Sequence, residues 1–278
     1  MSEFKPLESV RVITLALNVP GPLAAKRWLE LGATVIKVEP PEGDPLEIYC
    51  SDWYQELNAG QQRCVLDIKS VDGKRGLADL LSTADILLTA QRPAALSRLG
   101  SSWAELHKQY PRLNHLAVVG YPAPKENEAG HDLTYQASLG LLNPPIMPKT
   151  LMADLAGAER AALEGLALLM GSKAGQEGQQ KLVTLSEAAE YMAQPLKHGL
   201  THDGGMLAGE LPEYSLYETA SGWVAVAALE PHFRARFKKE LGLTKLSHQA
   251  VAEKLKQKPA SEWVKWAKQH DIPLAEVK

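Results

Sequence analysis

The residues best suited to chemistry lie in the segment 128–160. His131 and Asp132 stand just before one predicted helix, and Asp154 stands at the start of a second helix that runs to about Met170. An imidazole and a carboxylate at the N-termini of neighbouring helices can act as acid and base on one substrate. The alternative is structural, because an aspartate at a helix start commonly caps that helix and a loop histidine is commonly solvated. Asp132 could cap its own helix or orient the imidazole.

Glu230 is a third candidate. It lies between Leu229 and Pro231, at a predicted turn from a strand to a helix, and an ordinary exposed turn carboxylate is the plainer interpretation. No Gly-x-Gly-x-x-Gly follows the first strand, and no phosphate-binding Gly-Lys-Ser/Thr loop occurs. The two cysteines, Cys50 and Cys64, lack the spacing of a metal site. We therefore expect no metal and no nucleotide cofactor of the usual kinds.

Strands and helices that could position these residues alternate over the first 120 residues. The predicted strands are 10–15, 34–38, 64–67, 86–89 and 116–120, and the predicted helices are 23–31, 73–83, a short helix from Pro93, and 103–110. This alternation predicts an α/β fold, a Rossmann-like open parallel sheet with helices on both faces. Ligands bind beyond the carboxyl ends of the strands in such sheets, so the loop 40–45 is a candidate binding edge.

The pattern of elements changes after the Gly-rich stretch over 201–209. A long Ala- and Leu-rich helix over 152–170, a strand over 181–185 and a helix over 186–200 come first, and a Gly-rich stretch over 201–209 follows. Beyond it we expect a hairpin of 214–218 and 223–229 and three helices over 231–241, 248–257 and 260–269. The sequence therefore predicts a large Rossmann-like domain over 1–202 and a small α+β domain over 203–278.

Composition narrows the class of protein. The net charge of −3 and the isoelectric point near 6.3 argue against a general nucleic-acid binder. The N-terminus has no apolar signal core, and no run of about 18 apolar residues could cross a membrane. With only two cysteines, the chain fits a reducing compartment, so we expect a cytoplasmic location and no membrane partner.

Longer stretches resemble the class III CoA-transferase (CaiB/BaiF) superfamily. The resemblance rests on Gly-Pro-Leu-Ala-Ala at 21–25, the run at 31–41 that ends in Lys-Val-Glu-Pro-Pro, Gly-Asp-Pro-Leu at 43–46, and Arg-Pro-Ala-Ala-Leu-Ser-Arg-Leu-Gly at 92–100. Within that superfamily, Gly-His-Asp-Leu-Thr-Tyr at 130–135 and Ala-Leu-Glu-Pro at 228–231 are similar to the α-methylacyl-CoA racemase branch.

The resemblance implies a substrate and a site. The substrate would be an acyl-CoA thioester, with CoA as part of the substrate and no separate cofactor. His131, held by Glu230, would face Asp154 across the α-carbon, and backbone N–H groups near Asp154 would bind the enolate oxygen. Arg92, with Lys37 and Arg98 as weaker candidates, would bind the CoA phosphates. Relatives form dimers whose chains interlock, so a homodimer is expected.

Three functions stay open from the sequence. The first is an acyl-CoA racemase or epimerase that exchanges the α-proton of a 2-methylacyl-CoA. The second is a CoA transferase in which Asp154 attacks the thioester and forms a covalent aspartyl-CoA thioester. The third is a catalytically impaired relative that binds CoA esters or only dimerises.

Several departures from the family pattern motivate the third function. Thr14 and Leu17 stand where relatives usually have Asp and Arg, and residues 58–61 read Asn-Ala-Gly-Gln where relatives have Asn-Arg-Gly-Lys. Glu159 lies one turn after Asp154 and could raise its pKa or pair with a cation. The chain is also expected to be shortened at its C-terminus, which would put the interlocked dimer in doubt.

Overall fold

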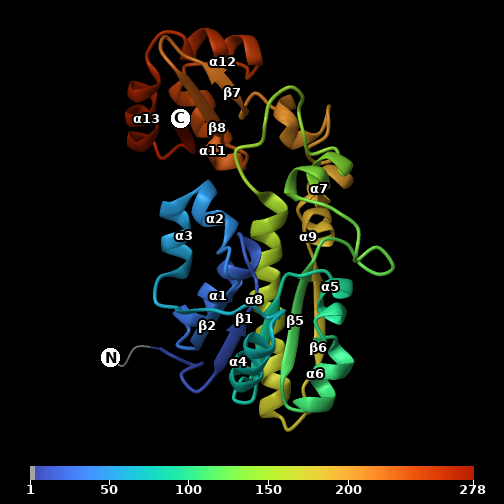
Figure 1. Cartoon of the computed structure of the whole chain (residues 1–278). Helices are drawn as coiled ribbons and strands as arrows, with labels where there is room; N and C mark the ends of the chain where they lie inside the picture. The colour runs from blue at the N-terminus through green and yellow to red at the C-terminus, as the bar shows by residue number, and fades with distance from the viewer. Residues whose placement is uncertain (1–3) are drawn as a thin grey trace. The chain divides into compact units, whose positions relative to one another are not determined.

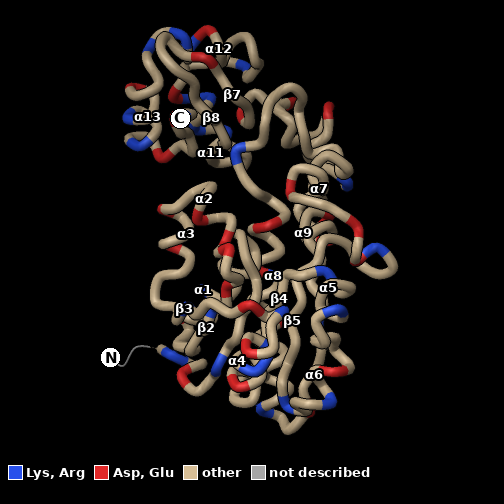
Figure 2. The backbone as a smooth tube through the Cα atoms, viewed as in Figure 1, with Lys and Arg blue, Asp and Glu red and all other residues tan. Residues whose placement is uncertain are grey.

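The computed structural model describes residues 4–278. The chain divides into two compact units, Met1–Ala193 and Gln194–Lys278, which Figure 1 shows in blue to yellow and in orange to red. The sequence placed the division between 202 and 203, in the loop that follows the short helix α10 (Gln194–Lys197). Acidic and basic residues are interspersed along each unit (Figure 2). No helix within residues 4–278 is both long enough and apolar enough to cross a bilayer.

A six-stranded parallel sheet forms the centre of the first unit. Its strand order is β3-β2-β1-β4-β5-β6, and every neighbouring pair is parallel. The strands are β1 (Arg11–Thr14), β2 (Thr34–Glu39), β3 (Gln62–Val65), β4 (Ile86–Thr89), β5 (Asn114–Val119) and β6 (Gln180–Thr184). The order reverses between β1 and β4, and open sheets of this kind leave a crevice beyond the strand ends at that point. The predicted Rossmann-like sheet is confirmed.

Helices cover both faces of this sheet. Val12 and Leu116 pack against α1 (Pro20–Glu30) and α8 (Met152–Lys173), in one apolar cluster. Ile13 and Leu87, each adjacent along its strand to a residue of the first cluster, belong to a second cluster with α4 (Val71–Leu81) and α6 (Trp103–Gln109). Because successive side chains of a strand point to opposite faces, strands buried on both sides must be apolar throughout.

Close helix packing sets the position of α8. The Trp28 ring of α1 is fully buried, and its Nε1–H donates to the carbonyl oxygen of Ala162 at 3.0 Å. Opposite the ring, a Cβ added at Gly165 would lie 2.1 Å from Trp28 Cζ2, so only glycine fits there. On another side, a Cβ at Gly157 would lie 2.4 Å from Leu185 of α9. These contacts direct the N-terminus of α8 to the crevice.

The remaining helices of the first unit are short. They are α2 (Pro45–Tyr49), α3 (Ser51–Asn58), α5 (Pro93–Arg98), α7 (Asp132–Ser138) and α9 (Leu185–Met192). The sequence did not predict α2 and α3, which follow the loop 40–45. The predicted helix over 186–200 is interrupted at Ala193, and Pro195 in α10 has no N–H to continue it.

The second unit is a small α+β structure. Three antiparallel strands in the order β7-β8-β9 pack against three helices around Phe237, Val251 and Trp263. The elements are the kinked segment η1 (Met206–Glu210), β7 (Tyr214–Glu218), β8 (Trp223–Ala227), α11 (Pro231–Glu240), α12 (His248–Leu255), α13 (Ala260–Gln269) and β9 (Leu274–Val277). The predicted hairpin and three helices are present, and β9 was not predicted.

Candidate functional site

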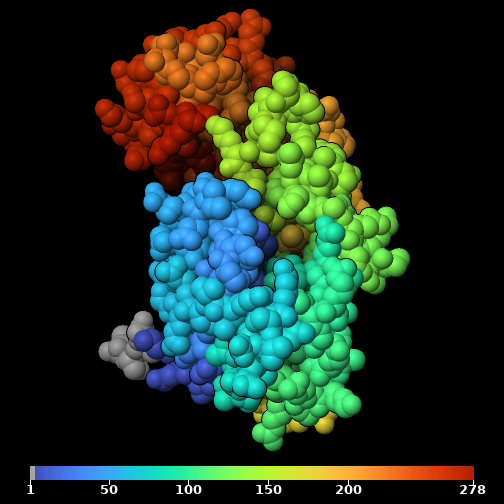
Figure 3. Space-filling model, viewed as in Figure 1, coloured from blue at the N-terminus to red at the C-terminus, as the bar shows by residue number. Residues whose placement is uncertain are grey.

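A cavity of about 610 Å³ lies at the carboxyl ends of the strands in the first unit. Its lining includes Leu17 after β1, Arg92 after β4, and Gly120 after β5. The cavity is therefore at the reversal of strand order, where this type of sheet binds its ligands. Figure 3 shows a hollow between the blue part of the chain that carries α2 and α3 and the green part that leads into α7. His131 and Asp154 both line this cavity.

Asp132 joins the starts of the two helices that carry the predicted site. It is the first residue of α7 and is 5% exposed. Its Oδ1 accepts the backbone N–H groups of Ala153 at 2.6 Å and Asp154 at 3.1 Å, and its Oδ2 accepts Gln136 Nε2 at 2.5 Å. From the sequence, Asp132 was expected to cap its own helix, α7, or to orient the His131 imidazole. In the structure its carboxylate caps α8 instead. His131, the preceding residue, is thereby held near the start of α8.

This cap corrects one prediction. The backbone N–H groups near Asp154 were expected to bind an enolate oxygen, but those of Ala153 and Asp154 are already bonded to Asp132. A buried carboxylate that accepts two N–H groups satisfies the donors that a helix start leaves open. Donors for an oxyanion must therefore come from elsewhere in the cavity.

Asp154 is the third residue of α8 and is partly buried. Burial, and after it the negative charge of Asp132, raises the pKa of Asp154 from 3.8 to about 6. A carboxyl group with such a pKa can both accept and donate a proton near neutral pH. Glu159, the other carboxylate considered in this role, pairs with Arg27 of α1 at 2.7 Å.

His131 occupies the N-cap position of α7 and is exposed. Its backbone N–H donates to Thr134 Oγ1 at 3.0 Å, and that hydroxyl donates to the His131 carbonyl oxygen at 2.8 Å. Both bonds use the main chain of His131. They fix the residue at the helix start and leave the imidazole at the cavity wall.

The three predicted phosphate-binding cations lie in different places. Arg92, at the N-cap of α5, is exposed and lines the cavity. Arg98, the last residue of α5, is exposed but is not among the lining residues. Lys37 of β2 is completely buried, and its ammonium group binds Asp44 at 2.6 Å and Glu39 at 3.0 Å. Because this ammonium is enclosed by protein, we no longer assign Lys37 to the CoA phosphates.

The Lys37 ion pairs instead support the cavity wall. Asp44 also accepts the backbone N–H groups of Asn18 at 2.9 Å and Leu46 at 3.0 Å, so it caps α2 and ties the loop 40–45 to the turn after β1. Asn18 and Leu46 both line the cavity. Glu39 accepts Tyr54 Oη–H at 2.8 Å, which extends the network into α3. The predicted binding edge at 40–45 is thus held by buried charges.

Glu230 belongs to the second unit, whereas His131 and Asp154 belong to the first. It occupies the N-cap position of α11 and is exposed. Its predicted hydrogen bond to His131 stays a prediction.

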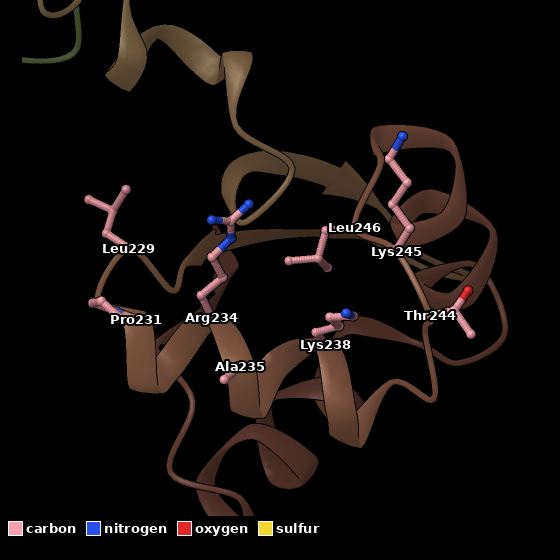
Figure 4. A pocket seen from close by; sticks show the side chains of 8 residues that line it. All are labelled: Leu229, Pro231, Arg234, Ala235, Lys238, Thr244, Lys245 and Leu246. Carbon is pink, nitrogen blue, oxygen red and sulfur yellow. The ribbon is translucent and has the colours of Figure 1, made fainter.

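A second cavity, of about 490 Å³, lies beside α11 (Figure 4). The residues that line it are Leu229, Pro231, Arg234, Ala235, Lys238, Thr244, Lys245 and Leu246. Its ionisable lining residues are Arg234, Lys238 and Lys245, and Arg234 is paired with Glu213 at 2.6 Å; none of its lining residues carries an imidazole or a carboxylate. Within residues 4–278, no three His, Cys, Asp or Glu side chains gather in a way that could hold a metal ion.

Tyr135 lines the first cavity, and no role was predicted for it from the sequence. Its ring is 1% exposed, and its hydroxyl group has no hydrogen-bond partner among the described residues. Tyr135 follows His131 by four residues, about one helical turn, and both residues line the cavity. That spacing is the sequence signal that could have identified it.

Comparisons with known proteins agree on one family. A family model described as CoA-transferase family III matches residues 7–278. Human alpha-methylacyl-CoA racemase is 30% identical over 256 residues, which are 85% of this chain and 65% of the racemase. Cinnamoyl-CoA:phenyllactate CoA-transferase of Clostridium sporogenes is 30% identical over 264 residues, which are 84% of this chain and 64% of the transferase.

Two solved structures share the fold. A hypothetical protein from Mycobacterium tuberculosis superposes with a TM-score of 0.85 at 23% identity, over 98% of this chain and 84% of that chain. A CAIB/BAIF family protein from Brucella suis gives a TM-score of 0.82 at 19% identity, over 99% of this chain and 84% of that chain. The chain spans a little under two thirds of the lengths of the human racemase and the Clostridium transferase. With a family model matched over nearly its whole length, this chain belongs to CoA-transferase family III.

Proposed function

We propose that the protein is an acyl-CoA racemase or epimerase that exchanges the α-proton of a 2-methylacyl-CoA thioester. One observation carries the proposal: His131 and Asp154 line the same cavity at the strand-order reversal. The bonds from Asp132 to the start of α8 support it, since they bring the N-termini of α7 and α8 together.

The reaction needs two groups of opposite protonation state on the two faces of the α-carbon. One group removes the α-proton, the electron pair moves into an enolate, and the other group returns a proton to the opposite face. For one enantiomer the imidazole of His131 is the base and the carboxylic acid of Asp154 is the acid, and for the other enantiomer the roles reverse. An Asp154 pKa of about 6 supports this, because both forms of the carboxyl group are then populated near neutral pH.

The CoA portion of the substrate carries phosphates that need cations. Arg92 is our first candidate, because it is exposed at the cavity wall, and Arg98 is a weaker one, one helix length away on α5. Arginine suits phosphate because its guanidinium group presents paired donors. Glu230 as the partner of His131, and a homodimer as the active assembly, are parts of the same proposal.

Deuterium uptake tests this function. The protein is incubated in D₂O with (R)- and (S)-2-methylacyl-CoA esters of several chain lengths, and exchange at the α-carbon is followed by NMR. We expect exchange with the wild-type protein and a loss of about a hundred-fold or more in His131→Gln and in Asp154→Asn. An absence of exchange with every ester, under conditions in which calorimetry shows binding, would leave a CoA-ester-binding protein without racemase activity.

A CoA transferase is the second candidate, because the similar relatives include enzymes of that name, such as the Clostridium sporogenes protein at 30% identity. Ionised Asp154 would attack the thioester carbonyl carbon, form a mixed anhydride and release the CoA thiolate. The thiolate would then attack the Asp154 carbonyl carbon, which gives an aspartyl-CoA thioester and releases the acyl group as a carboxylate. Hydroxylamine would trap that thioester as a hydroxamate at Asp154, which mass spectrometry detects. His131→Gln separates the two functions, since only proton exchange requires the imidazole.

A further inference from the structure

The hydroxyl group of Tyr135 is a buried donor that nothing in the described part of the chain satisfies. The side chain is 1% exposed and lines the cavity that contains His131 and Asp154. Buried polar groups are normally hydrogen-bonded, because removing them from water without a new partner is unfavourable. A buried, unpaired hydroxyl on a residue that lines a cavity indicates a ligand atom that accepts a hydrogen bond from it.

The surroundings hold this hydroxyl in place. A Cβ added at Gly120 or at Gly130 would lie 2.6 Å from Tyr135 Oη, so the backbone at both positions passes directly beside the oxygen. Tyr121 contacts the ring edge-on, with ring centroids 5.2 Å apart. The two glycine positions and the Tyr121 ring therefore pack closely against the Tyr135 side chain.

Burial is the main reason that Tyr135 stays protonated. Burial, the neighbouring Tyr121 and the carboxylate of Asp154 raise the pKa of Tyr135 to about 12, while Arg92 opposes this rise. At neutral pH the group is therefore a donor. It lies within electrostatic reach of Asp154, the carboxyl group proposed to exchange the α-proton.

An enolate oxygen needs a fixed donor, and the first-turn N–H groups of Ala153 and Asp154 are bonded to Asp132. We propose that Tyr135 is a further catalytic residue, whose O–H donates a hydrogen bond to the thioester carbonyl oxygen and to the enolate oxygen formed from it. The proton stays on Tyr135, and the bond strengthens as negative charge develops on the substrate oxygen. This role rests on the proposed racemase function.

Tyr135→Phe tests the role, because it removes only the hydroxyl. Since that hydroxyl is unpaired without a ligand, the variant is expected to be at least as stable as the wild type in a thermal melt. We expect α-deuterium exchange to fall about a hundred- to a thousand-fold, in kcat more than in KM. Tyr121→Phe is the matched control: it alters the same ring pair outside the cavity lining, and its exchange rate should stay within about three-fold.

A binding measurement makes the test independent of catalysis. Calorimetry compares a 2-methylacyl-CoA thioester with the thioether analogue in which CH₂ replaces the carbonyl group. The wild type should prefer the thioester by about three- to ten-fold, and Tyr135→Phe should lose that preference. Gly120→Ala displaces the hydroxyl without removing it and should reduce the preference as well. In Gly120→Ala/Tyr135→Phe the clash is relieved, so the melting temperature should recover while the preference stays lost.

The outcomes separate this inference from the function on which it rests. Exchange by the wild type with an unchanged rate in Tyr135→Phe overturns the role of Tyr135 and leaves the racemase proposal standing. A thioester preference that depends on Tyr135, without exchange, supports the carbonyl contact and overturns the racemase proposal. No binding of either CoA compound by the wild type overturns both.

Discussion

Replacing Asp154 by asparagine should stabilise the first unit at neutral pH while it abolishes activity. The pKa of Asp154 is raised from 3.8 to about 6 by burial and by the charge of Asp132. The folded state therefore binds the proton more tightly than the unfolded state, and ionisation at neutral pH opposes folding. A difference of about two pKa units corresponds to about 3 kcal/mol of unfolding free energy.

The sign of the pH dependence follows from the raised pKa. Below pH 3.8 the carboxyl group is protonated in both states, so its shift contributes nothing there. Between pH 3.8 and about 6 the unfolded state loses its proton first, and the free energy of unfolding falls as the pH rises. Above pH 6 the loss is complete. The amide of the Asp154→Asn variant cannot ionise, so the variant should avoid this loss.

Urea unfolding of the wild type and Asp154→Asn from pH 3.5 to pH 8 measures the effect. The difference in unfolding free energy should increase across the interval and reach up to about 3 kcal/mol in favour of the variant. Asp72→Asn is the matched control, because Asp72 is an exposed aspartate in the first turn of α4. A difference between wild type and Asp154→Asn that does not change with pH would refute the reasoning.

Packing and buried charges lead to three further predictions. Lys37→Met leaves Asp44 and Glu39 buried without their cation and should lower the unfolding free energy in a urea titration by about 3–5 kcal/mol. Lys26→Met is the control: it breaks the ion pair with the exposed Glu56 and should lower the unfolding free energy by less than about 1 kcal/mol. Gly165→Ala places a methyl group against the Trp28 ring and should lower the melting temperature, with a loss of about 1–3 kcal/mol; an unchanged melting temperature would contradict the packing described for α1 and α8. Asp132→Asn keeps an acceptor for the two N–H groups of α8 but removes the charge that raises the pKa of Asp154. The acid limb of the pH–rate profile for deuterium exchange should therefore move to lower pH. A limb that does not move would exclude Asp132 as a cause of the raised Asp154 pKa.

The fold was largely predictable because its signals are local in the sequence. Short apolar segments that alternate with segments of helical periodicity predicted the parallel sheet. All five strands predicted within the first 120 residues are present. The short helices α2 and α3 were missed because five and eight residues show too little helical periodicity. Asp44 caps α2 while its carboxylate binds Lys37 on the neighbouring strand, and periodicity does not record that contact.

The site was predictable only in part, for a related reason. The sequence selected His131 and Asp154, which line one cavity. It could not show that Asp132 caps α8 by bonding the backbone 21 residues later, because that bond depends on the packing of α7 against α8. It also assigned Lys37 to the CoA phosphates, although a lysine between two apolar residues of a parallel strand is in a position that such sheets bury.

The position of Asp132 at the start of α8 affects both the pKa of Asp154 and the donors open to an enolate oxygen. A helix N-terminus normally lowers the pKa of a nearby carboxyl group, because its free N–H groups and dipole favour negative charge. Here burial raises the pKa of Asp154, and Asp132 adds to the rise because it binds the N–H groups of Ala153 and Asp154 and places a negative charge beside Asp154. The same bonds remove those donors from an enolate oxygen. The carboxylate of Asp132 thus adds to the effect of burial in making Asp154 a suitable acid, and it creates the need for another donor, which the unpaired hydroxyl of Tyr135 can meet.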